Sequence, residues 1–236
     1  DFEKSLRVLT TGGKVSAHYL VRDQPAEIYG LVDETRRAWQ AGVSSWGGMT
    51  SLNSGSIGIE IVNPGFVDEP TGRRYFPYPQ AQIDQVIALC KDIVARNHIK
   101  PEKVVGHSDI APGRKQDPGP LFPWQQLAEA GIIPWPNADK VATKLAEYQA
   151  ATELPGIAWY QEKLAKIGYG ISKTGEYDVA TKDALAAFQT RYRPSNFIGA
   201  PDAETAALLD VMTAPEGMLM WSGKPGEAPR PYTAHW

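Results

Sequence analysis

Apolar and polar positions follow two different periods in the first two-thirds of the chain. Short runs rich in β-branched and aromatic residues, bounded by glycine, proline or polar residues, predict strands at 15–21, 28–33 and 56–63. Residues 79–99 place apolar side chains at the spacing of an amphipathic helix, with a proline at its start. Residues 103–105 predict a further strand. This order predicts an α/β domain with a mixed β-sheet flanked by helices.

The rest of the chain changes in pattern and predicts a second, small three-helix domain. Asp178 and Asp202 each precede an apolar-periodic run and are expected to cap two of its helices. The C-terminal segment is rich in proline and glycine and has no period, which predicts an irregular tail. The expected parts are an α/β domain, a linker, a helical domain and a tail, at residues 1–137, 138–153, 154–213 and 214–236.

Composition and charge narrow the classes of protein that fit. The 236 residues carry a net charge of −3, which gives no reason to expect nucleic acid as a partner. Cys90 is the single cysteine, so an intrachain disulfide and a Cys-rich zinc site are excluded, and its place in an apolar helical stripe predicts a buried, inert thiol. The chain has no run of about 18 apolar residues, so the sequence predicts no transmembrane helix. The chain opens at Asp1 without methionine or a signal peptide, so we expect upstream residues to have been removed or left out.

A proline-rich loop, VVGHSDIAPGRKQDPGPLFPW, concentrates the charged groups of residues 104–124. Its His107 and Asp117 carry side chains of the kinds that bind zinc, and a catalytic zinc usually keeps three protein ligands and one open position. On spacing alone, two unrelated surface groups are the more common interpretation.

Glu60 is an isolated acid within an otherwise apolar predicted strand. Because an unpaired buried carboxylate is costly, it is either a strand residue facing solvent or a general base with a raised pKa. The four histidines of the chain can be sorted by position. His98 ends the long helix, where a cation is favourable, and His235 lies in the tail, which leaves His18 and His107 as the site histidines.

The segments SAHYLV, LNSGSIGIEIVN and GHSDIAPGRKQDPGP together resemble the zinc-dependent N-acetylmuramoyl-L-alanine amidases. This superfamily also holds the peptidoglycan recognition proteins and phage amidase lysozymes. The resemblance covers about residues 1–213 and is strongest to the bacterial AmiD/AmpD-like branch with a C-terminal peptidoglycan-binding domain. It implies hydrolysis of the amide between N-acetylmuramic acid and L-alanine of the stem peptide, with peptidoglycan as the partner.

The resemblance also implies roles for four residues. His107 and Asp117 match two of three zinc ligands, Glu60 matches the catalytic glutamate, and Lys115 matches the basic residue beside the scissile carbonyl. In this mechanism zinc activates a water molecule, Glu60 takes its proton, and Lys115 stabilises the oxyanion.

The sequence departs from the family pattern at two positions. The third zinc ligand of the family is a histidine at the end of the first strand, which we expect in a piece missing upstream of Asp1. The rival interpretation is a non-catalytic muropeptide-binding protein that lacks this ligand. His18 is expected to shape the site or pack beneath it rather than bind metal. Gln40 stands where relatives often carry histidine, which affects rate or preference but not the zinc mechanism.

Three further residues are candidate substrate contacts. Trp46 and Asn53 precede the Glu60 strand, and Arg114 neighbours Lys115. Two alternatives stay open: Trp46 only anchors its loop, and Arg114 pairs with Asp109. For the reaction, a zinc peptidase cutting within the stem peptide also stays open, and the helical domain could be a generic stabilising bundle. The expected location is the periplasm or cell envelope, and an outer-membrane lipoprotein with a lipid anchor in the missing N-terminus is one form that this prediction allows.

Overall fold

The computed structural model describes residues 1–236, and its first part is built on a three-stranded mixed sheet of order β2-β1-β3. β1 (Tyr19–Val21) pairs in parallel with β3 (Ile59–Ile61) and antiparallel with β2 (Ile28–Gly30). The predicted mixed α/β fold is confirmed. Each strand is shorter than the sequence predicted, because only these residues make ladder hydrogen bonds.

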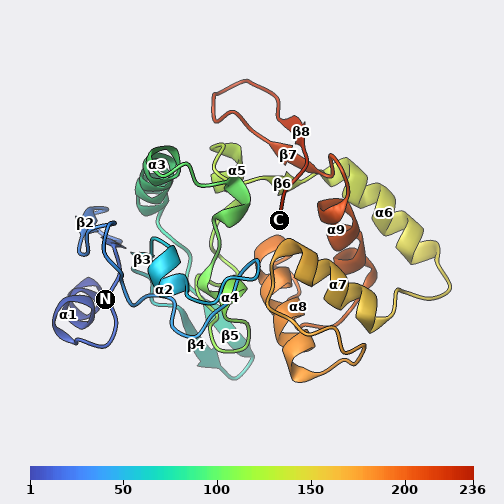
Figure 1. Ribbon diagram of the computed structural model, residues 1–236, viewed down its shortest axis with the longest axis horizontal. Coiled ribbons are helices and arrows are strands. Elements are labelled where there is room, and N and C mark those ends of the chain that lie inside the picture. The colour runs from blue at the N-terminus through green and yellow to red at the C-terminus, as the bar shows by residue number, and fades with distance from the viewer.

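The long helix α3 (Gln80–Arg96) packs beside this sheet (Figure 1) and supplies the core of the first part. Its buried side chains meet Trp124 and Leu127 of α5 (Trp124–Glu129). The helix starts directly after Pro79, as its periodicity predicts, and ends three residues before the predicted boundary. It is the longest helix, at 17 residues, and no helix has the length and apolar character needed to cross a bilayer.

Short elements connect the sheet to the loops around it. They are α1 (Phe2–Thr11), α2 (Leu52–Gly55), the hairpin strands β4 (Phe66–Glu69) and β5 (Gly72–Tyr75), the 3-10 turn η1 (Pro101–Lys103) and α4 (His107–Ile110). The strand predicted at 103–105 is wrong. Pro101 starts a tight turn, which Val104 closes with a backbone hydrogen bond of 3.3 Å to the Pro101 carbonyl, and this segment pairs with no strand.

Three helices form the second part, as predicted: α7 (Ile157–Ile167), α8 (Val179–Tyr192) and α9 (Ala203–Thr213). The Asp178 carboxylate accepts a hydrogen bond of 2.8 Å from the Thr181 amide, and Asp202 does the same for Thr205. Both predicted caps are therefore confirmed. The core between these helices consists of side chains with almost no exposure, among them Tyr160, Leu164, Leu185, Phe188 and Leu209.

The segments on either side of the helical part are more regular than the sequence predicted. Within the expected linker, α6 (Ala138–Ala150) is a full helix that packs along α9. Within the expected irregular tail, β7 (Met218–Met220) and β8 (Arg230–Tyr232) form an antiparallel sheet with β6 (Trp135–Pro136). The prediction of an irregular tail is wrong at these strands, because β7 and β8 pair with each other within the tail and β7 also pairs with the distant β6. The C-terminus ends between the two parts (Figure 1).

Candidate active site

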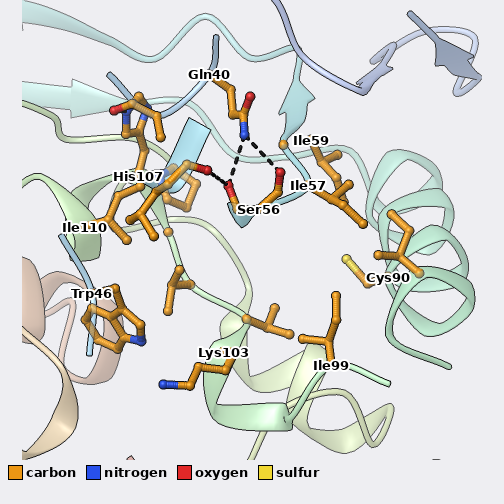
Figure 2. Close-up of a pocket in the computed structure, with 18 of the residues that line it drawn as sticks. Gln40, Trp46, Ser56, Ile57, Ile59, Cys90, Ile99, Lys103, His107 and Ile110 are labelled. Carbon is orange, nitrogen blue, oxygen red and sulfur yellow. Dashed lines mark hydrogen bonds between the residues drawn. The ribbon is translucent and has the colours of Figure 1, made fainter. Parts of the chain in front are cut away.

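A cleft of about 520 Å³ opens between β3, α3 and the segment that enters α4. Its apolar side is lined by residues such as Ile59, Cys90 and Ile99, and Figure 2 shows Cys90 and Ile99 across the cavity from His107. Glu60, His107 and Asp117 also line this cleft. The fold thus brings together three residues that the sequence singled out, from two separate segments.

The imidazole of His107 is held through both ring nitrogens. Nε2 lies 3.1 Å from the carbonyl oxygen of Ala41, and Nδ1 lies 2.9 Å from Oδ2 of Asp117. A carbonyl oxygen can only accept, so Nε2 must carry a proton to make its hydrogen bond. The contact between Nδ1 and Oδ2 of Asp117 is a hydrogen bond and needs a proton between the two atoms, and a cation bound to both atoms would take the place of that proton.

This arrangement fits part of a metal site. Two electron-pair donors, an imidazole nitrogen and a carboxylate oxygen, converge on one point, and a cation placed there would satisfy both. These donors are also the kinds that zinc takes in proteins. The 236 residues contain no group of three or more His, Cys, Asp or Glu side chains placed to hold a metal. The pair could supply two ligands of a metal ion.

Asp117 is ionised in this setting. Burial acts to raise the pKa of its carboxyl, but the hydrogen bond and charge of His107, together with the charge of Lys115, outweigh that effect. The net pKa lies below the usual value for an aspartate. A carboxylate in this state is the form that binds a cation.

Glu60 shows the opposite tendency. Its carboxyl pKa is raised, first by removal from bulk water inside the cleft and then by the negative charge of Asp117. The positive charges of His107 and Lys115 act against this rise in the pKa of Glu60. A raised pKa suits a carboxylate that takes up and returns a proton near neutral pH.

Two of the predicted substrate contacts are used inside the protein. The Asn53 side-chain oxygen accepts hydrogen bonds from the backbone amides of Ala41 and Gly42, at 2.7 and 3.2 Å. The Arg114 guanidinium donates to the carbonyls of Ala41 and Val43, at 2.7 Å each. Arg114 therefore fixes the loop that receives His107, and it does not pair with Asp109.

Trp46 is also an internal contact. Its side chain is 6% exposed and packs edge-on against Tyr169 of the helical part, with ring centroids 5.0 Å apart. Gly168 makes this possible, since a Cβ there would lie 2.8 Å from the Trp46 ring. These contacts favour the anchoring role that the sequence left open for Trp46.

His18 and Gln40 shape the neighbourhood of the cleft. His18 is 1% exposed, accepts from the Gly58 amide through Nδ1 at 3.0 Å, and contacts the Arg36 carbonyl through Nε2 at 3.0 Å. It packs beneath the site, as expected. Gln40 lines the cleft and donates to the Ser56 hydroxyl at 3.0 Å, as Figure 2 shows, while its buried Oε1 has no partner.

A mixed α/β fold whose cleft holds Glu60 together with His107 and Asp117 fits a hydrolase. Residues 2–120 match the family model described as N-acetylmuramoyl-L-alanine amidase, and residues 153–209 match that of a peptidoglycan binding domain. The chain belongs to the N-acetylmuramoyl-L-alanine amidase family. The predicted family and enzyme class are therefore confirmed.

Individual relatives agree with this assignment over most of the chain. The N-acetylmuramoyl-L-alanine amidase AmiD of Escherichia coli K12 is 46% identical over 219 residues, which cover 90% of this chain and 78% of AmiD. The structure of E. coli AmiD in complex with anhydro-N-acetylmuramic acid-L-Ala-D-γ-Glu-L-Lys superposes with a TM-score of 0.78 at 43% identity, covering 89% and 83% of the two chains. AmpDh3 of Pseudomonas aeruginosa superposes with a TM-score of 0.81 at 40% identity, covering 89% and 85%.

The sequence did not predict the groups that contact His107 and its helical turn from outside the cleft. The Ala41 carbonyl is backbone and carries no signal in the sequence. Tyr169 and Arg191, from the helical part, both contact Asp109 beside the His107 turn. The only local signal for Arg191 is its place in α8 three residues after the buried Phe188, on the apolar side of the helix.

Proposed function

We propose that the protein is a zinc amidase in which His107 and Asp117 are two of the metal ligands, Glu60 is the general base and Lys115 stabilises the oxyanion. The observation that carries this proposal is the convergence of His107 Nδ1 and Asp117 Oδ2, 2.9 Å apart, in the cleft that Glu60 also lines. In this proposal Trp46, Asn53 and Arg114 do not contact the substrate. They hold the loop whose Ala41 carbonyl accepts the hydrogen bond from His107 Nε2.

The residues of the chain divide the work of amide hydrolysis. Zinc bound at the pair would supply polarisation of the scissile carbonyl and a lowered pKa for a water molecule. Glu60 takes a proton from the attacking water and returns it to the leaving amine of L-alanine. Lys115 contributes a fixed positive charge where negative charge develops on the carbonyl oxygen.

The substrate that we propose is a muropeptide of the kind bound in the AmiD complex, with an N-acetylmuramic acid linked through its lactyl group to L-alanine. The second domain, matched to a peptidoglycan binding domain, favours polymeric wall as well as soluble fragments. We propose that the protein acts in the cell envelope, where this polymer lies, and that it is located in the periplasm. A lipid anchor stays a prediction.

Mass spectrometry of digested muropeptides tests this function. The expected products are the free sugar and an intact stem peptide with a new L-alanine amino terminus. Fragments cut within the peptide would show a peptidase instead. Binding of the muropeptide without any product, in protein loaded with zinc, would show the non-catalytic alternative.

A further inference from the structure

The turn that carries His107 cannot hold its own position. α4 is a single turn of four residues, and an isolated helix of that length is unstable because its nucleation cost is not recovered. Its placement in the cleft must come from tertiary contacts. Among the residues of α4, Asp109 is the one that contacts the peptidoglycan-binding domain through its side chain, which is 1% exposed.

The carboxylate of Asp109 accepts three hydrogen bonds. One comes from within the turn, from the Gly106 amide to Oδ2 at 2.8 Å. The other two come from the peptidoglycan-binding domain: Arg191 Nη1 donates to Oδ2 at 2.7 Å, and the Tyr169 hydroxyl donates to Oδ1 at 2.8 Å. Arg191 also donates to the Val104 carbonyl at 3.1 Å, just before the turn.

Burial makes these contacts obligatory. The Arg191 side chain is 8% exposed, so neither member of the ion pair can turn to water instead. Removing one partner of such a pair leaves an uncompensated buried charge, which costs far more than the pair gains relative to an apolar replacement. Asp109, and with it the turn, therefore takes the position that Arg191 and Tyr169 dictate.

The same domain also holds the other side of His107. Its Gly168 carbonyl accepts from the Gly47 amide at 2.8 Å, and Tyr169 packs against Trp46. This loop continues back to Ala41, whose carbonyl contacts His107 Nε2. Both segments that orient the imidazole thus contact this domain, and Asn53 and Arg114 hold the Ala41 loop from the other side.

We propose that Arg191 and Tyr169 are positioning residues for His107, so that the peptidoglycan-binding domain is a structural part of the amidase site and not only a tether to the wall. Neither residue touches the reacting atoms; they act through Asp109 and α4. This inference rests on the proposed role of His107 as a metal ligand.

Arg191→Ala tests it on the purified protein with a soluble anhydro-muropeptide, whose cleavage does not require anchoring to the wall. The expected result is a loss of about 10- to 100-fold in kcat and a zinc affinity weakened to a similar extent, with KM little changed, as for other residues that orient a metal ligand. Zinc affinity is measured by competition with a chelator. Tyr169→Phe, which removes only the hydroxyl, is expected to shift both quantities in the same direction by a smaller factor.

Arg193→Ala is the matched control. Arg193 is as buried as Arg191, at 7% side-chain exposure, but its ion pairs with Asp202 and Glu204 lie inside the peptidoglycan-binding domain. This variant should lower the melting temperature while kcat and zinc affinity stay within about twofold of wild type.

The outcomes separate the inference from the function on which it rests. If Arg191→Ala and Tyr169→Phe behave like Arg193→Ala, with stability lowered and kcat and zinc affinity unchanged, the positioning role is overturned while the zinc amidase stands. If Arg191→Ala does not fold, Tyr169→Phe decides alone. A wild type that neither binds zinc nor cleaves the muropeptide overturns the proposed function, and the inference with it.

Discussion

Nδ1 of His107 and Oδ2 of Asp117 lie 2.9 Å apart, although the two residues are 10 positions apart along the proline-rich loop. A backbone hydrogen bond of 2.9 Å, from the Ser108 amide to the Asp117 carbonyl, also joins the two segments. Apart from the single turn α4, the segment from His107 to Asp117 has no regular secondary structure, yet it holds these two side chains at a fixed distance. The expected loss of zinc affinity in Asp117→Ala depends on this pairing of the two side chains.

Glu60→Gln should remove most of the activity and leave the fold intact. An amide of the same size cannot take up a proton, and general acid–base catalysis contributes about 10²- to 10⁴-fold. We expect kcat on a muropeptide to fall by that order, with the circular dichroism spectrum unchanged. Glu153→Gln, at an exposed position before the second domain, serves as the control. Near-normal turnover of the Glu60 variant in zinc would rule out this base.

Lys115→Met should lower kcat by about 10²-fold or more, because a charge that stabilises the developing oxyanion is lost. Lys115→Arg keeps the charge and should retain a larger share of the activity. Steady-state kinetics of the two variants, side by side, check this role. Equal activity of the Met and Arg variants would mean that the charge of Lys115 does not act on the transition state.

A cluster around Glu34 should make stability depend on pH in the acid range. Hydrogen bonds from Arg96, at 2.9 Å to each oxygen, are the largest cause that lowers the pKa of Glu34 to about 2, with further bonds from Tyr19 and Asn97. A lowered folded-state pKa stabilises the protein above the unfolded value of about 4.3, and this stabilisation is lost as pH falls toward 2.

The Glu34→Gln variant isolates this effect. At neutral pH it should be less stable than wild type by about 1 kcal/mol, since the pair is partly screened by solvent. The difference between the two proteins should shrink as pH falls from about 4.3 toward the folded-state pKa. Urea unfolding at several pH values measures it, and a difference that stays constant with pH would contradict the assignment.

Cys90 should be unreactive in the folded protein. Burial raises the pKa of its thiol to about 12, and the side chain is 7% exposed, so almost no thiolate is available at neutral pH. A disulfide reagent should modify it only after unfolding in urea. Rapid modification of the native protein would show that the apolar side of the cleft opens.

Elements defined by local pattern could be predicted from the sequence. The apolar spacing that places α3 and the capping aspartates Asp178 and Asp202 depend on contacts within a few residues. Membership of the amidase family could also be predicted, because the motif of the proline-rich loop is specific. Its geometry agrees with that interpretation at the His107–Asp117 pair.

Features that depend on contacts between distant segments could not be predicted. In the tail, Leu219 of β7 pairs with Trp135 of the distant β6 as well as with Pro231 of β8. Arg114 has the composition of a substrate contact, but the carbonyls that it binds lie on a loop far away in the sequence. Likewise, nothing local to Asp109 indicates that its partner is Arg191 of another domain.

The zinc affinity of the purified protein, compared with that of the Asp117→Ala variant, shows whether His107 and Asp117 bind the metal. If His107 and Asp117 are ligands, wild type should hold a single zinc against a competing chelator, and the variant should bind it at least 100-fold more weakly while keeping its fold. Equal affinity of the two proteins, or a wild type that does not bind zinc, would contradict the account.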